Sequence, residues 1–312
     1  MGNFWSQPLR VEDTENLQLI TSRTMNSALW FVNNKALEER ILAFLAKYIE
    51  KHEVELYALV ILGNHYHMMA RFPKANRALF FKDFNARVAE SVRCLVSEFR
   101  GGTLFERRYS AQAMLLDTDI MHYYKYCALQ PVSAGLTERI SEYPGYNSFK
   151  YSTAGIAKTY KLMCYGAYNA AKRTNPNISK KHFIVEHKLQ YKRLPGFEEL
   201  SRDEYRKILS GDVEKKRLEL VKVRKDSGKS FVGREKLLKI RPGSYPHSTK
   251  KGSRQPLVLT ECLVSRKKYL SWYFSVVEEH KIASERYHAG EVDVEFPPGT
   301  YKPTSLHAPM VT

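Results

Sequence analysis

The sequence has few cysteines, and the four that it has (Cys94, Cys127, Cys164 and Cys262) stand far apart. This spacing excludes a zinc ribbon and a disulfide framework. Long apolar runs are also missing, because the stretch 57–62 falls far short of the roughly 18 to 20 residues that a bilayer crossing needs. The amino terminus lacks the basic and apolar regions of an export signal. We therefore expect a cytoplasmic protein that does not span a membrane.

Acidic residues are too few to balance the basic ones. The 312 residues are 43% hydrophobic, which allows a packed core in one large or two modest domains. Fifty Lys and Arg against 33 Asp and Glu give a formal charge of +17, and residues 151–312 carry +15 of it. A nucleic acid is the partner that this excess favours over a merely solubilising surface, although composition does not distinguish DNA from RNA.

Residue patterns in the first half alternate between strand and helix periodicity. The expected elements are a strand at 16–24, a helix with apolar spacing over 37–49, strands at 54–62 and 65–72, a helix at 75–99, a strand at 109–116 and a helix at 120–130. Gly63 and Asn64 form a turn that tolerates positive φ. This order is that of an α+β, ferredoxin-like antiparallel sheet with two helices on one face, followed by one further helix.

The second half has a different composition. We expect helices at 154–172, 203–225 and 263–280, with a loop over 241–256. The chain thus divides into a first domain, 1–152, and a basic extension, 153–312, that is mainly helical and irregular.

Two clusters of side chains could carry chemistry. His65 and His67 stand at i and i+2, a spacing that on a strand directs both imidazoles to one open face of the sheet, where they could bind a metal ion. On the helix 120–130, His122, Tyr126 and Gln130 share one side. Each pattern alone is also compatible with chance, or with an ordinary tyrosine of an amphipathic helix.

At these residues the sequence resembles the HUH single-tyrosine transposases, and more closely the REP-associated tyrosine transposases. The family pattern Met-Pro-Asn-His-x-His corresponds to residues 62–67, and Tyr-Ile-x-x-Asn-Pro-x-x-Ala-Gly-Leu corresponds to residues 126–136. Further agreement lies at 21–23, 105–109, 142–144 and 148–149, so the resemblance covers about 14–152. Gly63 replaces the usual proline, which should loosen the hairpin, and Gln130 stands where much of the subfamily has asparagine.

The resemblance implies roles for these residues. His65 and His67 would bind Mg²⁺ or Mn²⁺, Gln130 would be a third ligand or position the phosphate, and Tyr126 would be the nucleophile. A phenol with a pKa near 10 needs an activated electrophile, which the metal supplies by polarising the scissile phosphate. A 5′-phosphotyrosine ester would conserve the energy of the broken bond, so that the free 3′-OH can rejoin it.

Single-stranded DNA beside short hairpins is the substrate that the resemblance implies. Arg23, Arg107 and Arg108 would contact phosphates, and Tyr109 would stack on a base. The basic extension either grips the hairpin stem or is a solvated linker; its densest cationic cluster comprises Lys250, Lys251, Arg254, Arg266, Lys267 and Lys268. We expect a monomer, with a homodimer left open. A hairpin-binding protein that does not cut, and a replication-initiator or relaxase nuclease, are the alternative functions.

Overall fold

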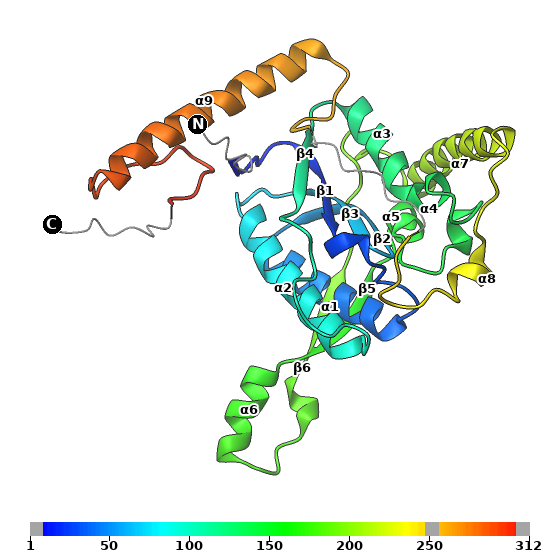
Figure 1. Ribbon diagram of the computed structural model, residues 1–312, viewed down its shortest axis with the longest axis horizontal. Helices are drawn as coiled ribbons and strands as arrows, with labels where there is room; N and C mark the ends of the chain where they lie inside the picture. The colour runs from blue at the N-terminus through cyan, green and yellow to red at the C-terminus, as the bar shows by residue number, and fades with distance from the viewer. Residues whose placement is uncertain (1–8, 247–255, 304–312) are drawn as a thin grey trace.

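The computed structural model describes residues 9–246 and 256–303, and an antiparallel sheet lies at its centre (Figure 1). The strands are β1 (Leu17–Arg23), β2 (Glu55–Leu62), β3 (His65–Arg71) and β4 (Ser110–Met114), in the order β2-β3-β1-β4. Helix α1 (Lys35–His52) joins β1 to β2, and α2 (Arg77–Leu95) joins β3 to β4. This is the ferredoxin-like arrangement, so the predicted fold class is confirmed.

Alternation along the strands gives the sheet two apolar faces. Ile20, Met68 and Ala70 pack against α1 and α2 in the first core, and Leu19 and Met69 point to the other face. The Oδ1 atom of Asn34 accepts a hydrogen bond from the amide of Leu37 at 2.9 Å, which caps the start of α1. The cap and the apolar spacing fix the helix against the sheet.

The second face is covered as well, which the sequence did not indicate. Helix α3 (Asp117–Ala128) places Tyr124 and Cys127 on this face, and α7 (Arg202–Asp226) adds Tyr205 and Leu209 to the same core. Between them lie α4 (Gln130–Ser133) and α5 (Phe149–Ala154). Helices α3 and α7 therefore cover much of the sheet face that was expected to be open.

The segments after residue 152 pack onto the first-half sheet and helices only in part, because the one at 165–183 projects away from the sheet (Figure 1). They comprise β5 (Lys158–Met163), α6 (Tyr165–Thr174), β6 (Ile184–Leu189), α7, α8 (Arg234–Leu237) and α9 (Leu263–His288). Leu189 and Tyr191 enter the first core, and Val258 makes a parallel bridge to Ala113 at the β4 edge of the sheet. Short 3-10 helices lie at Met25–Ser27, Ile140–Glu142 and Lys180–Phe183.

Strand β5 corrects the first part of the helix predicted over 154–172, whereas 165–172 is helical as predicted and belongs to α6. The residues of β5 alternate, with Tyr160 and Leu162 turned toward the first core and Thr159 and Lys161 exposed, and the strand pairs with β6 beside α1. Period-two burial and the β6 partner outweigh the local helix propensity. Among the described helices, none has both the length and the apolar content needed to cross a bilayer.

The hairpin turn between β2 and β3 differs in detail from its prediction. Gly63 does not have a positive φ. A Cβ at this position would instead lie 2.8 Å from Leu29 Cδ2 and 2.9 Å from Val32 Cγ1. The loop before α1 thus packs tightly on the turn and leaves little room for a side chain at Gly63.

Candidate functional site

The two histidines lie side by side on β3, on the face covered by α3. His67 pairs with Thr21 and His65 pairs with Arg23 in the register with β1. Their ring centroids are 4.9 Å apart. Tyr66, between them, is buried in the first core on the opposite face. Strand alternation therefore places both imidazoles on the same face of the sheet, as the sequence predicted.

A neighbouring side chain holds each imidazole through Nδ1. His65 Nδ1 lies 2.6 Å from Asn64 Oδ1, and Asn64 donates its amide N–H to the Ser27 carbonyl at 3.0 Å. That second bond orients the amide, so His65 Nδ1 is the donor. His67 Nδ1 lies 2.7 Å from Thr21 Oγ1. Such partners fix ring orientation and leave Nε2 to bind a ligand.

Burial keeps both imidazoles uncharged at neutral pH. Desolvation, the neighbouring His67 and Arg23 hold the pKa of His65 well below its usual value. Desolvation and Arg23 lower the pKa of His67 to about 3. A neutral imidazole is the form that coordinates a metal.

Helix α3 brings Tyr126 to the same place. Its neighbour Cys127 is buried against the sheet, with Sγ 3.8 Å from the His67 carbonyl oxygen. The Tyr126 ring meets the His67 ring edge to face at a centroid distance of 5.5 Å and remains 41% exposed. Packing of Cys127 on β3 thus sets the tyrosine beside the histidine pair while leaving the ring accessible.

Gln130 completes the cluster from α4, because α3 ends at Ala128 and the predicted continuous helix is interrupted. Burial raises the pKa of the Tyr126 phenol, whereas a hydrogen bond with the Gln130 side chain and the charge of Arg23 lower it. Desolvation has the largest effect, so the pKa of Tyr126 is raised overall and the phenol is protonated at neutral pH.

A hollow of about 440 Å³ opens beside Tyr126, between α3 and α7. Lys125, Lys215 and Lys216 line it together with Asp212 and Glu219. Lys216 pairs with Glu219 at 2.9 Å. The extension thus supplies cationic side chains to the wall next to the tyrosine.

The donor set fits a divalent cation. Neither Nε2 atom has a hydrogen-bond partner among the described residues, and the side-chain oxygen of Gln130 offers a hard donor close by. The part of the chain that the structure describes holds no group of three His, Cys, Asp or Glu arranged for a metal. His65 and His67 are two donors of the kind that could hold such an ion, and Gln130 would be the third.

The residues predicted to contact DNA do not all lie at the tyrosine–histidine cluster. Arg23 lies at the site, and its carbonyl accepts from the Glu106 amide at 3.0 Å, which brings the loop of exposed Arg107 and Arg108 close to the end of β1. Tyr109 is on the opposite face of the sheet, its ring 4.1 Å from that of Phe81.

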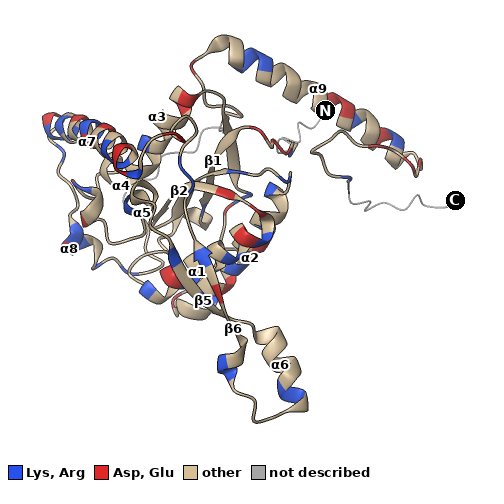
Figure 2. Ribbon diagram, turned by 180° about the vertical axis from the view of Figure 1, so that it is seen from behind, with Lys and Arg blue, Asp and Glu red and all other residues tan. Residues whose placement is uncertain are grey.

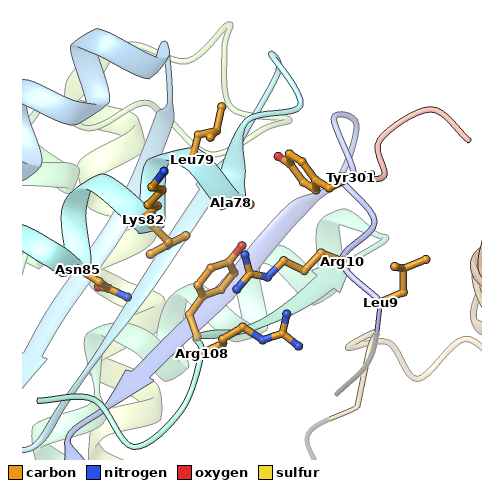
Figure 3. A pocket seen from close by; sticks show the side chains of 10 residues that line it. Leu9, Arg10, Ala78, Leu79, Lys82, Asn85, Arg108 and Tyr301 are labelled. Carbon is orange, nitrogen blue, oxygen red and sulfur yellow. The ribbon is translucent and has the colours of Figure 1, made fainter. Parts of the chain in front are cut away.

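Arg108 and Tyr109 line a second hollow, of about 680 Å³, away from the histidines. Figure 3 shows Arg10 beside Arg108 there, and the Arg10 guanidinium lies 5.4 Å from the Tyr109 ring centroid. The structure therefore does not bring Tyr109 to the tyrosine–histidine cluster.

The predicted cationic cluster of the extension is only partly described. Arg266, Lys267 and Lys268 are exposed on α9. Lys250, Lys251 and Arg254 lie outside the described residues. Lys and Arg of the extension are spread over α7, α8 and α9 (Figure 2).

Sequence reasoning missed Thr21, Asn64 and Lys215. The first two were visible as neighbours, since Asn64 precedes His65 and Thr21 lies in the first-strand motif. Lys215 carried no local signal, because only the packing of α7 on α3 brings it near Tyr126.

Comparisons with known proteins give partial structural matches. No family model and no curated protein matches the sequence. The structure is similar to that of a REP-associated tyrosine transposase bound to a REP hairpin, with 16% identity and a TM-score of 0.40 over 46% of this chain and 83% of the other. It is also similar to a candidate transposase from Deinococcus radiodurans, with 16% identity and a TM-score of 0.28 over 40% and 95% of the two chains.

Proposed function

We propose that this chain is a single-stranded DNA endonuclease and strand transferase of the REP-associated tyrosine transposase type, acting beside hairpins through a covalent 5′-phosphotyrosine. One observation carries the proposal. A strand and a helix far apart in sequence bring the His65–His67 pair and an accessible Tyr126 together. The ring centroids of His65 and His67 are 4.9 Å apart, and those of His67 and Tyr126 are 5.5 Å apart. A phenol beside paired neutral imidazoles suits metal-assisted attack on a phosphodiester.

The side chains divide the work of cleavage. A Mg²⁺ or Mn²⁺ ion bound by His65, His67 and Gln130 would supply the Lewis acid that polarises the scissile phosphate. Arg23 adds positive charge at the same point, where negative charge develops. Tyr126 attacks phosphorus through its phenolic oxygen, the bond to the 3′ oxygen breaks, and the 5′ phosphate stays on the tyrosine. Attack by a 3′-OH reverses the step.

His67 is assigned to ligation and not to proton transfer. Its pKa of about 3 makes its imidazole a weak base at neutral pH. The Tyr126 phenol is also protonated at neutral pH, because burial raises its pKa despite the opposing effects of Gln130 and Arg23. Tyr126 would therefore lose its proton to solvent through its exposed side.

An unpaired strand suits this site better than a regular duplex. Helices α3 and α7 flank the tyrosine and leave a hollow of about 440 Å³ rather than a flat face. Cationic side chains of the extension could hold the adjoining hairpin by its phosphates. We propose a monomeric enzyme, because His65, His67 and Tyr126 can meet within a single chain.

A denaturing gel tests this function. End-labelled hairpin oligonucleotides from the genomic flank of the gene are incubated with Mn²⁺ or with EDTA. We expect a protein-linked band that needs Mn²⁺ and disappears in Tyr126→Phe. Tyr123→Phe, whose ring lies 6.0 Å from that of Tyr126, is the matched control and keeps the band. Tight binding without an adduct would instead identify a hairpin-binding protein that does not cut.

A further inference from the structure

A groove of about 1000 Å³ begins at His65 and runs away from Tyr126. One wall comes from the loop before α1 and the β2–β3 turn, including Phe31 and Asn64. The other comes from residues 134–145 and from the segment 230–246, which contains α8. Figure 1 shows that segment in yellow, after α7. The groove is thus continuous with the proposed catalytic site and is built partly by the extension.

The segment 230–246 is fixed to the first-half loops by hydrogen bonds. The Asn33 side chain donates to the carbonyls of Leu237 and Ile240 at 2.9 and 2.8 Å. The Leu29 amide donates to the Ser244 carbonyl at 2.8 Å. Gly243 has a φ of 81°, and a Cβ there would lie 2.8 Å from the Trp30 ring. This wall of the groove is therefore a defined element of the fold.

The lining has one sign of charge. Lys236, Lys239 and Arg241 are exposed along it, and no aspartate or glutamate is among the described residues that line it. A polyanion that reaches His65 would thus meet cationic and no anionic side chains among the described residues of this groove.

Aromatic rings line the same groove as these cations. Phe31, Tyr143 and Phe231 are partly exposed in the groove, and Tyr245 is 65% exposed. Tyr143 is held by donating its hydroxyl to the Ile61 carbonyl at 2.9 Å. Exposed rings beside cationic groups stack on unpaired bases, whose faces a duplex would hide.

We infer that this groove binds the single-stranded DNA that continues from the phosphate held at His65, with Tyr245 as a stacking platform and Lys239 as a phosphate contact. The inference rests on the proposed function for its choice of ligand. It gives the segment 230–246 a direct part in holding the substrate.

Fluorescence anisotropy tests the inference on full-length Tyr126→Phe protein in EDTA. The probes are a labelled hairpin with single-stranded thymidine tails and the same hairpin with blunt ends. We expect Tyr245→Ala to weaken binding of the tailed probe about tenfold and to leave the blunt probe unchanged. Tyr165→Ala, which removes a 60% exposed tyrosine from α6, is the matched control and changes neither.

A tailed probe that binds Tyr245→Ala and Lys239→Gln as tightly as the parent protein would overturn the inference. So would an equal loss for both probes, which would indicate a duplex or nonspecific contact. Failure of the groove and failure of the proposed function are separable, because this binding is measured without cleavage. If wild-type protein forms no adduct while the tail-specific loss persists, the groove stands and the catalytic proposal falls.

Discussion

His65 and His67 depend on two small polar neighbours for their orientation. Asn64 and Thr21 each occupy Nδ1 of one imidazole, at 2.6 and 2.7 Å. The amide of Asn64 is itself fixed by the Ser27 carbonyl. Both Nε2 atoms are thereby directed toward the site, so the geometry of the proposed ligands is set before a metal arrives.

Replacing Thr21 by valine should weaken Mn²⁺ binding. The change keeps the shape of the side chain but removes the hydroxyl that orients His67, and loss of such a partner typically costs about 10- to 100-fold in metal affinity. Isothermal titration calorimetry with Mn²⁺ measures the affinity of the variant and of the wild-type protein. Thr159→Val, at an exposed strand position on β5, is the control and should bind Mn²⁺ normally. Equal affinities in both variants would contradict the orienting role.

At the scale of single elements, α3 holds Tyr126 in place through Cys127. Burial raises the pKa of the Cys127 thiol to about 12, and its Sγ faces the His67 carbonyl. The same helix turn therefore carries a buried anchor, Cys127, and the exposed Tyr126 that we propose as the nucleophile.

Cys127 should resist maleimide in the folded protein at pH 8. The thiolate is the reactive form, and both burial and the raised pKa suppress it. Cys94 and Cys164 are exposed and should react at once. Peptide mass spectrometry before and after denaturation measures the labelling. Native labelling of Cys127 at the rate of Cys94 would show that α3 is not packed on β3.

Helix α7 contributes charge beside Tyr126. Because Lys215 lines the hollow there, Lys215→Gln should reduce the salt dependence of DNA binding by about one phosphate contact. The slope of log K against log salt measures this. Lys222→Gln changes an exposed lysine of the same helix outside the hollow, and its slope should equal that of wild type. Indistinguishable slopes for the two variants would remove Lys215 from the interface.

The two halves of the chain were not equally predictable. In the first half, strand alternation and helical spacing fall on the elements that form, so β1 to α3 were found within a few residues. Tyr160 and Leu162 were misassigned to a helix because their strand pairs with β6 about 25 residues later. The pairing of His65 with His67 follows from strand geometry, and the role of Tyr126 came from the resemblance. Only tertiary packing brings Lys215 to the hollow beside Tyr126 and Tyr245 to the groove that begins at His65.

On the scale of the whole molecule, residues after 152 belong to both cores. Leu189 and Tyr191 pack into the first core, and Leu209 and Val213 pack against the face that carries α3. The extension therefore stabilises the sheet that positions the candidate site.

Leu209→Ala should destabilise the protein by about 2 to 5 kcal/mol, the usual range for a buried leucine. Leu209 is fully buried, whereas Leu218 on the same helix is 55% exposed. Leu218→Ala should change the free energy of unfolding by less than about 0.5 kcal/mol. Urea unfolding followed by circular dichroism compares them. Equal midpoints and slopes would mean that α7 does not support the fold.

The central claim is that Tyr126 becomes covalently attached to DNA. The most direct measurement is mass spectrometry of the wild-type protein after reaction with a hairpin oligonucleotide and Mn²⁺, followed by nuclease trimming and proteolysis. The account predicts a nucleotide linked through its 5′ phosphate to the peptide that contains Tyr126, with fragment ions placing it on that residue. A nucleotide on Tyr123 or another side chain, or cleaved DNA with no attached protein, would contradict it.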